Sequence, residues 1–180
     1  MSYQGWWKNC QQCEIASWAR QKVFVRVREG SNPALVFIGE GPGKAEDVLG
    51  LPFVGPAGQF LDAAIEAAGL SSRKCIFLNL VACRPCDGVG MGNRKPTEGE
   101  ILKCRPRLVT ALAELEPVVV VLLGKTVQQS ALTALSAVDW WGSVPVLELP
   151  HPSALLRRGG RLAEDYPVYV RKLKEVTDLG

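Results

Sequence analysis

Residues 34–43 read Ala-Leu-Val-Phe-Ile-Gly-Glu-Gly-Pro-Gly, an apolar run followed at once by a glycine-rich turn. The run has the length and β-rich composition of a strand that is buried on both faces of a parallel sheet. Pockets of α/β proteins lie beyond the carboxyl ends of such strands, where glycine lets the backbone approach a ligand closely. The turn and the residues after it carry three carboxylates, and Phe53 follows them, so this stretch predicts a small-molecule pocket.

The glycine spacing in this turn fits neither common nucleotide-binding loop. A dinucleotide loop needs a glycine three positions after Gly41, where Lys44 stands. A phosphate loop needs a glycine five positions before Gly43, where Ile38 stands, and Ser or Thr after the lysine, where Ala45 stands. We therefore expect the pocket to hold something other than a nucleoside triphosphate.

Strand and helix patterns alternate along the chain. Strands are predicted at residues 34–39, 75–80, 118–124 and 145–149, and helices at residues 56–68, 97–115, 125–136 and 166–178. Pro106 is expected to kink or restart the second helix. The alternation predicts a three-layer α/β/α fold around a four-stranded, mainly parallel sheet. With 180 residues, 47% of them hydrophobic, residues 1–180 suit one domain.

The net charge of +3 is mild, but Arg157, Arg158 and Arg161 gather around a Gly-Gly pair. Such a cluster is most often a solvated surface, although it also fits phosphate contacts. The chain starts without an apolar run of signal-peptide length, and no stretch is long enough to span a bilayer. We expect a cytoplasmic monomer without membrane partners.

Six cysteines in a chain without a secretory signal favour thiolate ligands or buried thiols over disulfides. Cys10 and Cys13 form a C-x-x-C pair in a polar setting, which is typical of one side of a metal or cluster site. Cys83 and Cys86 form a second pair, too distant for a compact zinc ribbon. The tertiary fold would have to complete the site, and Cys104 competes with Cys86 as the fourth ligand.

Two further loops follow predicted strands. Residues 86–97 are glycine-rich and follow the second strand, so they can form a mobile wall or lid of the pocket. Residues 151–158 follow the fourth strand and contain the only histidine, His151.

The motifs, taken together, resemble the uracil-DNA glycosylase superfamily. They occur in its order: residues 39–43, 51–55, 79–85, 93–96 and 151–153. With four cysteines the pattern is most similar to family 4, the iron-sulfur enzymes, from Cys10 to about Arg158. The resemblance implies excision of uracil from DNA by a monofunctional glycosylase in base excision repair, which leaves an abasic site.

The resemblance also implies a 4Fe-4S cluster on Cys10, Cys13, Cys83 and Cys104, with Cys86 as a non-ligand. Four thiolates suit zinc as well, and their chemistry alone does not separate the two. The cluster is expected to be structural.

Matching positions imply roles in base flipping and N-glycosidic bond cleavage. Phe53 would stack on the flipped base, and Asn79 would read its pyrimidine edge. His151 would donate a hydrogen bond to the base O2, where negative charge develops. Without the neighbouring motifs, a core Phe and a structural His are the simpler interpretations.

Activation of water is less direct. Gly41 stands where other branches of the superfamily place a catalytic Asp or Asn, so that general base is missing here. Glu46 and Asn93 match polar residues implicated in family 4, and we assign them to the water and the sugar cation. Glu40 would brace the loop beside the base. Acidic residues at the start of a helix are, however, common for dipole reasons alone.

The segment after His151 is expected to contact DNA. Ser153, Arg157 and Arg158 would bind phosphates, and Leu155 or Leu156 would wedge into the space that the flipped base leaves. Two adjacent leucines are otherwise core residues.

Two departures from family 4 leave alternatives open. Residues 86–92 form a longer, glycine-rich loop without the histidine that a related branch uses for covalent attachment to the sugar, so we do not expect that variant. Trp140 and Trp141 replace an expected Arg-Gly segment. The chain could therefore act on a different modified pyrimidine, such as a bulky modified cytosine of phage DNA. It could also be a non-catalytic iron-sulfur protein that binds nucleic acid.

Overall fold

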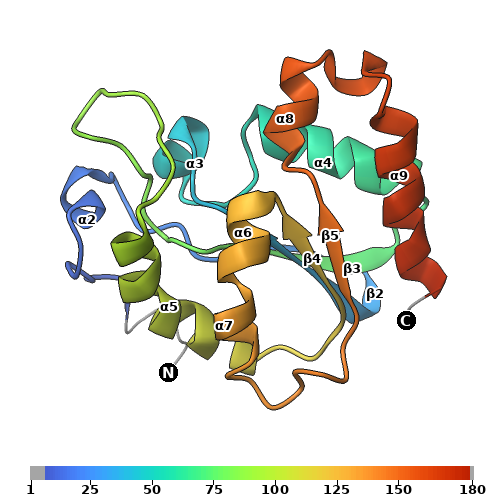
Figure 1. The fold of residues 1–180 in the computed structure, drawn as a ribbon, viewed down its shortest axis with the longest axis horizontal. Coiled ribbons are helices and arrows are strands. Elements are labelled where there is room, and N and C mark those ends of the chain that lie inside the picture. The colour runs from blue at the N-terminus through green and yellow to red at the C-terminus, as the bar shows by residue number, and fades with distance from the viewer. Residues whose placement is uncertain (1–6, 179–180) are drawn as a thin grey trace.

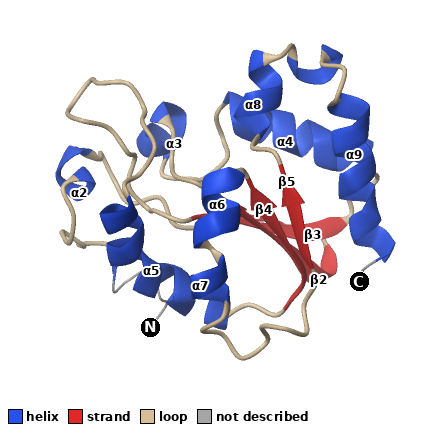
Figure 2. Cartoon of the chain, viewed as in Figure 1, coloured by secondary structure: helices blue, strands red, loops and turns tan. Residues whose placement is uncertain are grey.

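The structure, a computed structural model, describes residues 7–178, with five strands among them. The strands lie in the order β1-β3-β2-β4-β5, as Figures 1 and 2 show in part. Their bounds are Arg26–Arg28 (β1), Ser31–Gly39 (β2), Arg73–Asn79 (β3), Pro117–Leu123 (β4) and Val146–Leu149 (β5). The parallel strands β2 to β5 confirm the four predicted strands. The predicted number of strands was wrong, because β1 adds an antiparallel edge to β3.

Helices cover both faces of the sheet, which confirms the three-layer α/β/α prediction (Figure 1). One face carries α4 (Pro56–Ala67), α8 (Pro152–Arg157) and α9 (Tyr166–Lys174). The other carries α5 (Glu98–Ala113), α6 (Lys125–Ser130) and α7 (Leu132–Leu135). The shorter elements are α2 (Ile15–Trp18), α3 (Lys44–Leu49), η1 (Gly160–Leu162) and η2 (Glu175–Asp178).

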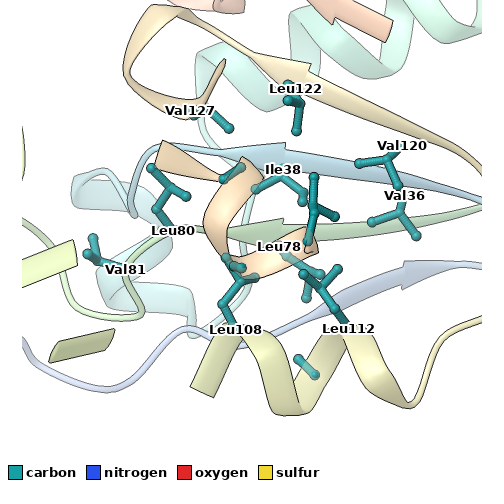
Figure 3. Packing of buried hydrophobic residues seen from close by; sticks show 14 of the residues in the cluster. Val36, Ile38, Leu78, Leu80, Val81, Leu108, Leu112, Val120, Leu122 and Val127 are labelled. Atoms are coloured by element: carbon teal, nitrogen blue, oxygen red, sulfur yellow. The ribbon is translucent and has the colours of Figure 1, made fainter. Parts of the chain in front are cut away.

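The central strand β2 shows why its sequence lacks polar alternation. Val36 and Ile38 point into the core beneath α5 and α6, as Figure 3 shows. Leu35 and Phe37 point into the second core, beneath α4, α8 and α9. Both faces of the strand are buried, so both sets of alternating side chains are apolar.

Some predicted helix boundaries differ from the observed ones. Helix α5 runs through Pro106 without restarting, and Thr97 caps it in a capping box with Glu100 as predicted. Residues 125–136 form two helices instead of one, and residues 166–178 end in the 3-10 turn η2. Over the described part of the chain, no helix is both long and apolar enough to cross a membrane. Three expectations stay predictions: the monomeric state, the cytoplasmic location and the single domain. The ends of that domain, residues 1–6 and 179–180, lie outside the described residues.

Candidate active site

A groove of about 1500 Å³ lies at the carboxyl ends of the parallel strands. The parallel register places Gly39 at the end of β2 directly beside Asn79 at the end of β3, so the loops after these two strands meet there. Almost all of the predicted catalytic, base-binding and DNA-binding residues line this groove: Glu40, Gly41, Glu46, Phe53, Asn79, Asn93, His151, Ser153, Leu156, Arg157 and Arg158. Segments far apart in the sequence are thus brought to one site.

The predicted base-reading pair is tightly held. Asn79 and Phe53 are 3% and 6% exposed, and the ring of Phe53 lies 5.7 Å from that of Phe77. Phe53 has a φ of 57°, which is strained for a residue with a side chain and is typical of functional sites. A Cβ on Gly39 would lie 2.4 Å from the Phe53 ring and 2.5 Å from Asn79 Oδ1. Only glycine at position 39 lets this aromatic and this amide stand together at the strand end.

Glu46 joins the two glycine turns on this side of the groove. Its Oε2 accepts a hydrogen bond from Gly43 N at 3.1 Å. Its Oε1 accepts bonds from Val54 N at 3.1 Å and Gly55 N at 2.7 Å. The side chain of Glu46 is only 8% exposed. Three backbone donors, two of which come directly after Phe53 in the chain, fix its carboxylate in the wall of the groove.

Gly41, which stands where other branches of the superfamily place a catalytic Asp or Asn, is enclosed by apolar neighbours. A Cβ on Gly41 would lie 2.9 Å from Val81 Cγ2 and 3.1 Å from Pro85 Cγ. Such distances require the neighbours to shift, so this backbone does not readily accept a larger side chain at position 41.

Asn93 reaches the groove from the glycine-rich loop after β3. Arg84 Nε donates to Asn93 Oδ1 at 2.6 Å, and Arg84 Nη2 donates to Met91 O at 2.5 Å. Arg94 N donates to Pro85 O at 3.0 Å and closes the loop at its base. The loop that was expected to be mobile is thus tied to the rest of the chain at several points.

His151 caps the N-terminus of α8. Its Nδ1 accepts a hydrogen bond from Ser153 N at 3.2 Å and lies 2.8 Å from Ser153 Oγ. Burial lowers the pKa of His151 below its ordinary value, while the nearby Glu40 carboxylate raises it and Arg157 lowers it. A neutral ring whose Nδ1 accepts carries its proton on Nε2, and Nε2 is then the donor that it can offer to a ligand.

The segment after His151 is the helix α8, not the loop that the sequence suggested. Leu155 is 1% exposed and packs into the core, so its assignment as a wedge was wrong: a helix turns one of two adjacent leucines inward. Leu156 is 36% exposed and lines the groove. Arg158 forms an ion pair with Asp165 on the surface. Leu162, 94% exposed in the turn η1, was missed, although an apolar residue within an Arg-Gly cluster is a usable signal.

Four predicted ligands line one small cavity, Cys10, Cys13, Cys83 and Cys104, while Cys86 is buried and does not line it. Burial, opposed by Lys22 and assisted by the neighbouring cysteines, raises the pKa of Cys83 to about 12. Ala82 N donates to Cys104 Sγ at 3.4 Å. Within residues 7–178, no three Cys, His, Asp or Glu side chains lie close enough to hold a metal ion as they stand.

Arg107, in α5, lies between this cavity and the groove and was also missed. It is 1% exposed, and its Nη2 donates to Asn79 O at 2.5 Å and to Leu80 O at 3.1 Å. Its Nε and Nη1 are buried without a hydrogen-bond partner among the described residues, and the side chain lines the cavity of the four cysteines. Two donors of a buried guanidinium thus lie at this cavity without a partner among the described residues.

The fold and groove define a class: an α/β/α protein whose ligand pocket opens at the carboxyl ends of parallel strands. The family model of the uracil DNA glycosylase superfamily matches residues 27–174. The chain therefore belongs to the uracil DNA glycosylase superfamily, as its motif order predicted.

Known relatives agree with this assignment. The type-4 uracil-DNA glycosylase of Archaeoglobus fulgidus is 31% identical over 183 residues, which cover 93% of this chain and 88% of that protein. The one from Thermotoga maritima is 34% identical over 160 residues, 83% of this chain and 79% of that protein. The one from Saccharolobus solfataricus is 40% identical over 119 residues. That match covers 66% of this chain and spans about half of the relative, 52% of its length.

Proposed function

We propose that this chain is a DNA glycosylase that excises uracil from DNA and leaves an abasic site, as a monofunctional enzyme of base excision repair. The observation that carries the proposal is the convergence of Phe53, Asn79 and His151 in one groove of a superfamily member. The names of the relatives, type-4 uracil-DNA glycosylases, support uracil as the base.

The reaction breaks the C1′–N1 bond of deoxyuridine, and the bonding electrons leave with the base. His151 Nε2–H would donate to O2 of the departing base and stabilise its negative charge. Removing one such donor costs about 10²–10³-fold in rate in well-studied enzymes. Water adds to C1′ of the oxocarbenium-like sugar and loses a proton, which balances protonation of the released base.

Recognition of the flipped base would rest on Phe53 and Asn79. The Asn79 amide offers one acceptor and two donors, which match the N3–H and O4 edge of uracil. Because the side chain is 3% exposed and Gly39 abuts its Oδ1, a rotated amide has little room. The ring of Phe53 would stack on the base face.

Glu46 and Asn93 would act on the sugar and the water. The three backbone donors on Glu46 favour a fixed negative charge facing the cationic sugar over a freely moving general base. Glu40 would brace the turn that carries Gly41 beside the base. Asn93 would orient the attacking water with its amide.

The DNA backbone would run along the rim that α8 and η1 form. Ser153, Arg157 and Arg158 line this part of the groove and would bind phosphates. Leu156, together with the more exposed Leu162, would fill the space that the flipped nucleotide leaves.

The four-cysteine cavity would hold a 4Fe-4S cluster rather than zinc. The support is the type-4 name of the relatives, and Cys10, Cys13, Cys83 and Cys104 line the cavity that would hold the cluster. Thiolate-bound cluster charge would also satisfy Arg107. When bound, the cluster would supply a cross-link between the segment before α2, the end of β3 and α5.

Incubating the purified, cluster-loaded protein with single- and double-stranded oligonucleotides that carry one uracil, followed by alkali, tests the proposal. We expect strand scission that is lost in His151→Ala and kept in Thr133→Ala, a control in α7. Scission only at modified cytosines or other damaged bases would move the substrate to another pyrimidine. Stable DNA binding without scission of any substrate would favour the non-catalytic alternative.

A further inference from the structure

Asn93 is an exposed side chain on a glycine-rich loop, yet its amide is held in place. Arg84, 8% exposed beneath the loop, donates from Nε to Asn93 Oδ1 and from Nη2 to Met91 O. One buried guanidinium thus fixes both the side chain of Asn93 and the backbone two residues before it. Without this contact an exposed asparagine would sample several rotamers.

Arginine also decides which way the amide faces. A guanidinium has only donors, so the atom that it binds must be the amide oxygen and never the amide nitrogen. Oδ1 of Asn93 is therefore turned toward Arg84, and Nδ2 faces the glycine turn of the groove. Gly43 faces both this nitrogen and Glu46 Oε2. A Cβ on Gly43 would lie 3.5 Å from Asn93 Nδ2 and 2.7 Å from Glu46 Oε2.

The backbone of Asn93 is anchored from its other side by Arg94. Arg94 Nη1 and Nη2 donate to the two carboxylate oxygens of Glu100 at 2.9 and 2.7 Å, and Arg94 Nε donates to Asp87 Oδ1 at 2.5 Å. Glu100 is itself bound to Thr97 N at 2.7 Å in the cap of α5. Two arginines therefore hold Asn93, but only Arg84 touches its amide.

We propose that Arg84 is a positioning residue for base excision, because it turns the Nδ2 donor of Asn93 toward the reacting sugar and water. The inference rests on the proposed function for its chemistry, whereas the held amide is a property of the free protein. Arg84 itself touches neither base nor sugar. Its whole effect on the reaction is transmitted through Asn93.

A double-mutant cycle tests this dependence. We expect Asn93→Ala to lower the single-turnover rate on uracil DNA about 100-fold, and Arg84→Ala to lower it at least about 10-fold because the amide is misplaced. In the Asn93→Ala background, Arg84→Ala should change the rate by less than about twofold. Arg84→Lys, which can still reach an amide oxygen, should recover part of the rate, with KM for DNA unchanged. Fully multiplicative losses would overturn the proposal.

Arg26→Ala is the matched control. Arg26 also forms two hydrogen bonds with one partner, Asp62 Oδ1 and Oδ2 at 3.0 and 2.9 Å, but at the β1 edge of the sheet. Its effect should be independent of Asn93→Ala, because its contacts with Asp62 and with the Phe77 ring, 4.0 Å from the guanidinium, do not involve Asn93. Should Arg84→Ala fail to fold, Asn93→Asp keeps the contact to Arg84, replaces the Nδ2 donor by an oxygen acceptor and adds a negative charge at that place. A wild-type rate in Asn93→Asp would contradict the proposal.

A measurement on the free protein separates this inference from the proposed function. The side-chain amide signal of Asn93, identified by its absence in Asn93→Ala, should show the heteronuclear NOE of a rigid group, keep part of it in Arg84→Lys and lose it in Arg84→Ala. An amide that is mobile in the wild type overturns the positioning role even if uracil is excised. An amide that is rigid only with Arg84 present supports it even if the wild type cleaves another base.

Discussion

Gly39→Ala is the change whose effect follows most directly from the geometry. The added Cβ would lie 2.4 Å from Phe53 Cζ and 2.5 Å from Asn79 Oδ1, and ordinary van der Waals contact begins at 3.4 Å. Both side chains must therefore retreat by about 1 Å, or the strand end must move. The Phe53 ring is packed at 5.7 Å from Phe77, and Arg107 holds the backbone carbonyl of Asn79, so neither the ring nor the strand end moves freely.

The magnitude follows from that displacement. A misplacement of about 1 Å in a reacting or recognition group costs on the order of 100-fold in rate, so kcat/KM on uracil DNA should fall about 100-fold. Overpacking by one methyl group should lower the free energy of unfolding by about 1–3 kcal/mol. The protein would remain folded if its stability is in the usual range of about 5–15 kcal/mol.

Single-turnover excision on a uracil oligonucleotide and urea unfolding measure the two effects in the same preparation. Gly99→Ala is the matched control, because a Cβ on this helical glycine meets nothing within 4 Å. It should keep the rate and raise the free energy of unfolding by about 0.5–1 kcal/mol. An unchanged rate in Gly39→Ala would refute the claim that Phe53 and Asn79 read the base in the observed arrangement.

Three further predictions concern the histidine, the rim and the cysteines. Burial lowers the pKa of His151 in the folded state. The free energy of unfolding, relative to that of His151→Gln, should therefore be constant above pH 6.5 and fall below pH 6.5 by at most about 1.4 kcal/mol per pH unit. Urea unfolding between pH 5 and 8 measures this difference, and a flat or opposite pH dependence would contradict the prediction. Joint replacement of Leu156 and Leu162 by alanine should lower the rate of excision from duplex DNA about tenfold more than the rate from single strands. An equal loss on both substrates would argue against a wedge. Cys104→Ser should abolish the visible iron-sulfur absorption and Cys86→Ser should keep it, and the reverse result would exchange their roles.

The sheet could be predicted from the sequence because its parallel strands are buried on both faces. Val36 and Ile38 pack on one side while Leu35 and Phe37 pack on the other, which gives an uninterrupted apolar run. Strand β1 could not be found in this way. It is three residues long, Arg26-Val27-Arg28, and its pairing to β3 depends on tertiary contacts.

The groove was predicted better than the residues that support it. Asn79 is the last residue of β3 and His151 lies two residues after β5, so topology brings them to the same edge once the strand order is known. Leu155 and Leu156 were not separable in sequence, because the helical phase of α8 decides which of them faces the core. Arg84 was visible only as a member of a motif, since its function depends on a contact nine residues further along the chain.

The glycines around the groove, whose spacing fits neither nucleotide-binding loop, have a different physical role in this fold. Gly39 makes room for the Phe53 ring and the Asn79 amide, and a Cβ on Gly43 or Gly55 would lie 2.7 or 3.0 Å from the carboxylate of Glu46. Gly58 admits the backbone of Phe53 so closely that a Cβ would lie 1.9 Å from its carbonyl oxygen. In a phosphate loop, glycine lets backbone amides surround a ligand. Here it makes room for the protein's own side chains and backbone, so even a residue as small as alanine would disturb the groove at each of these glycines.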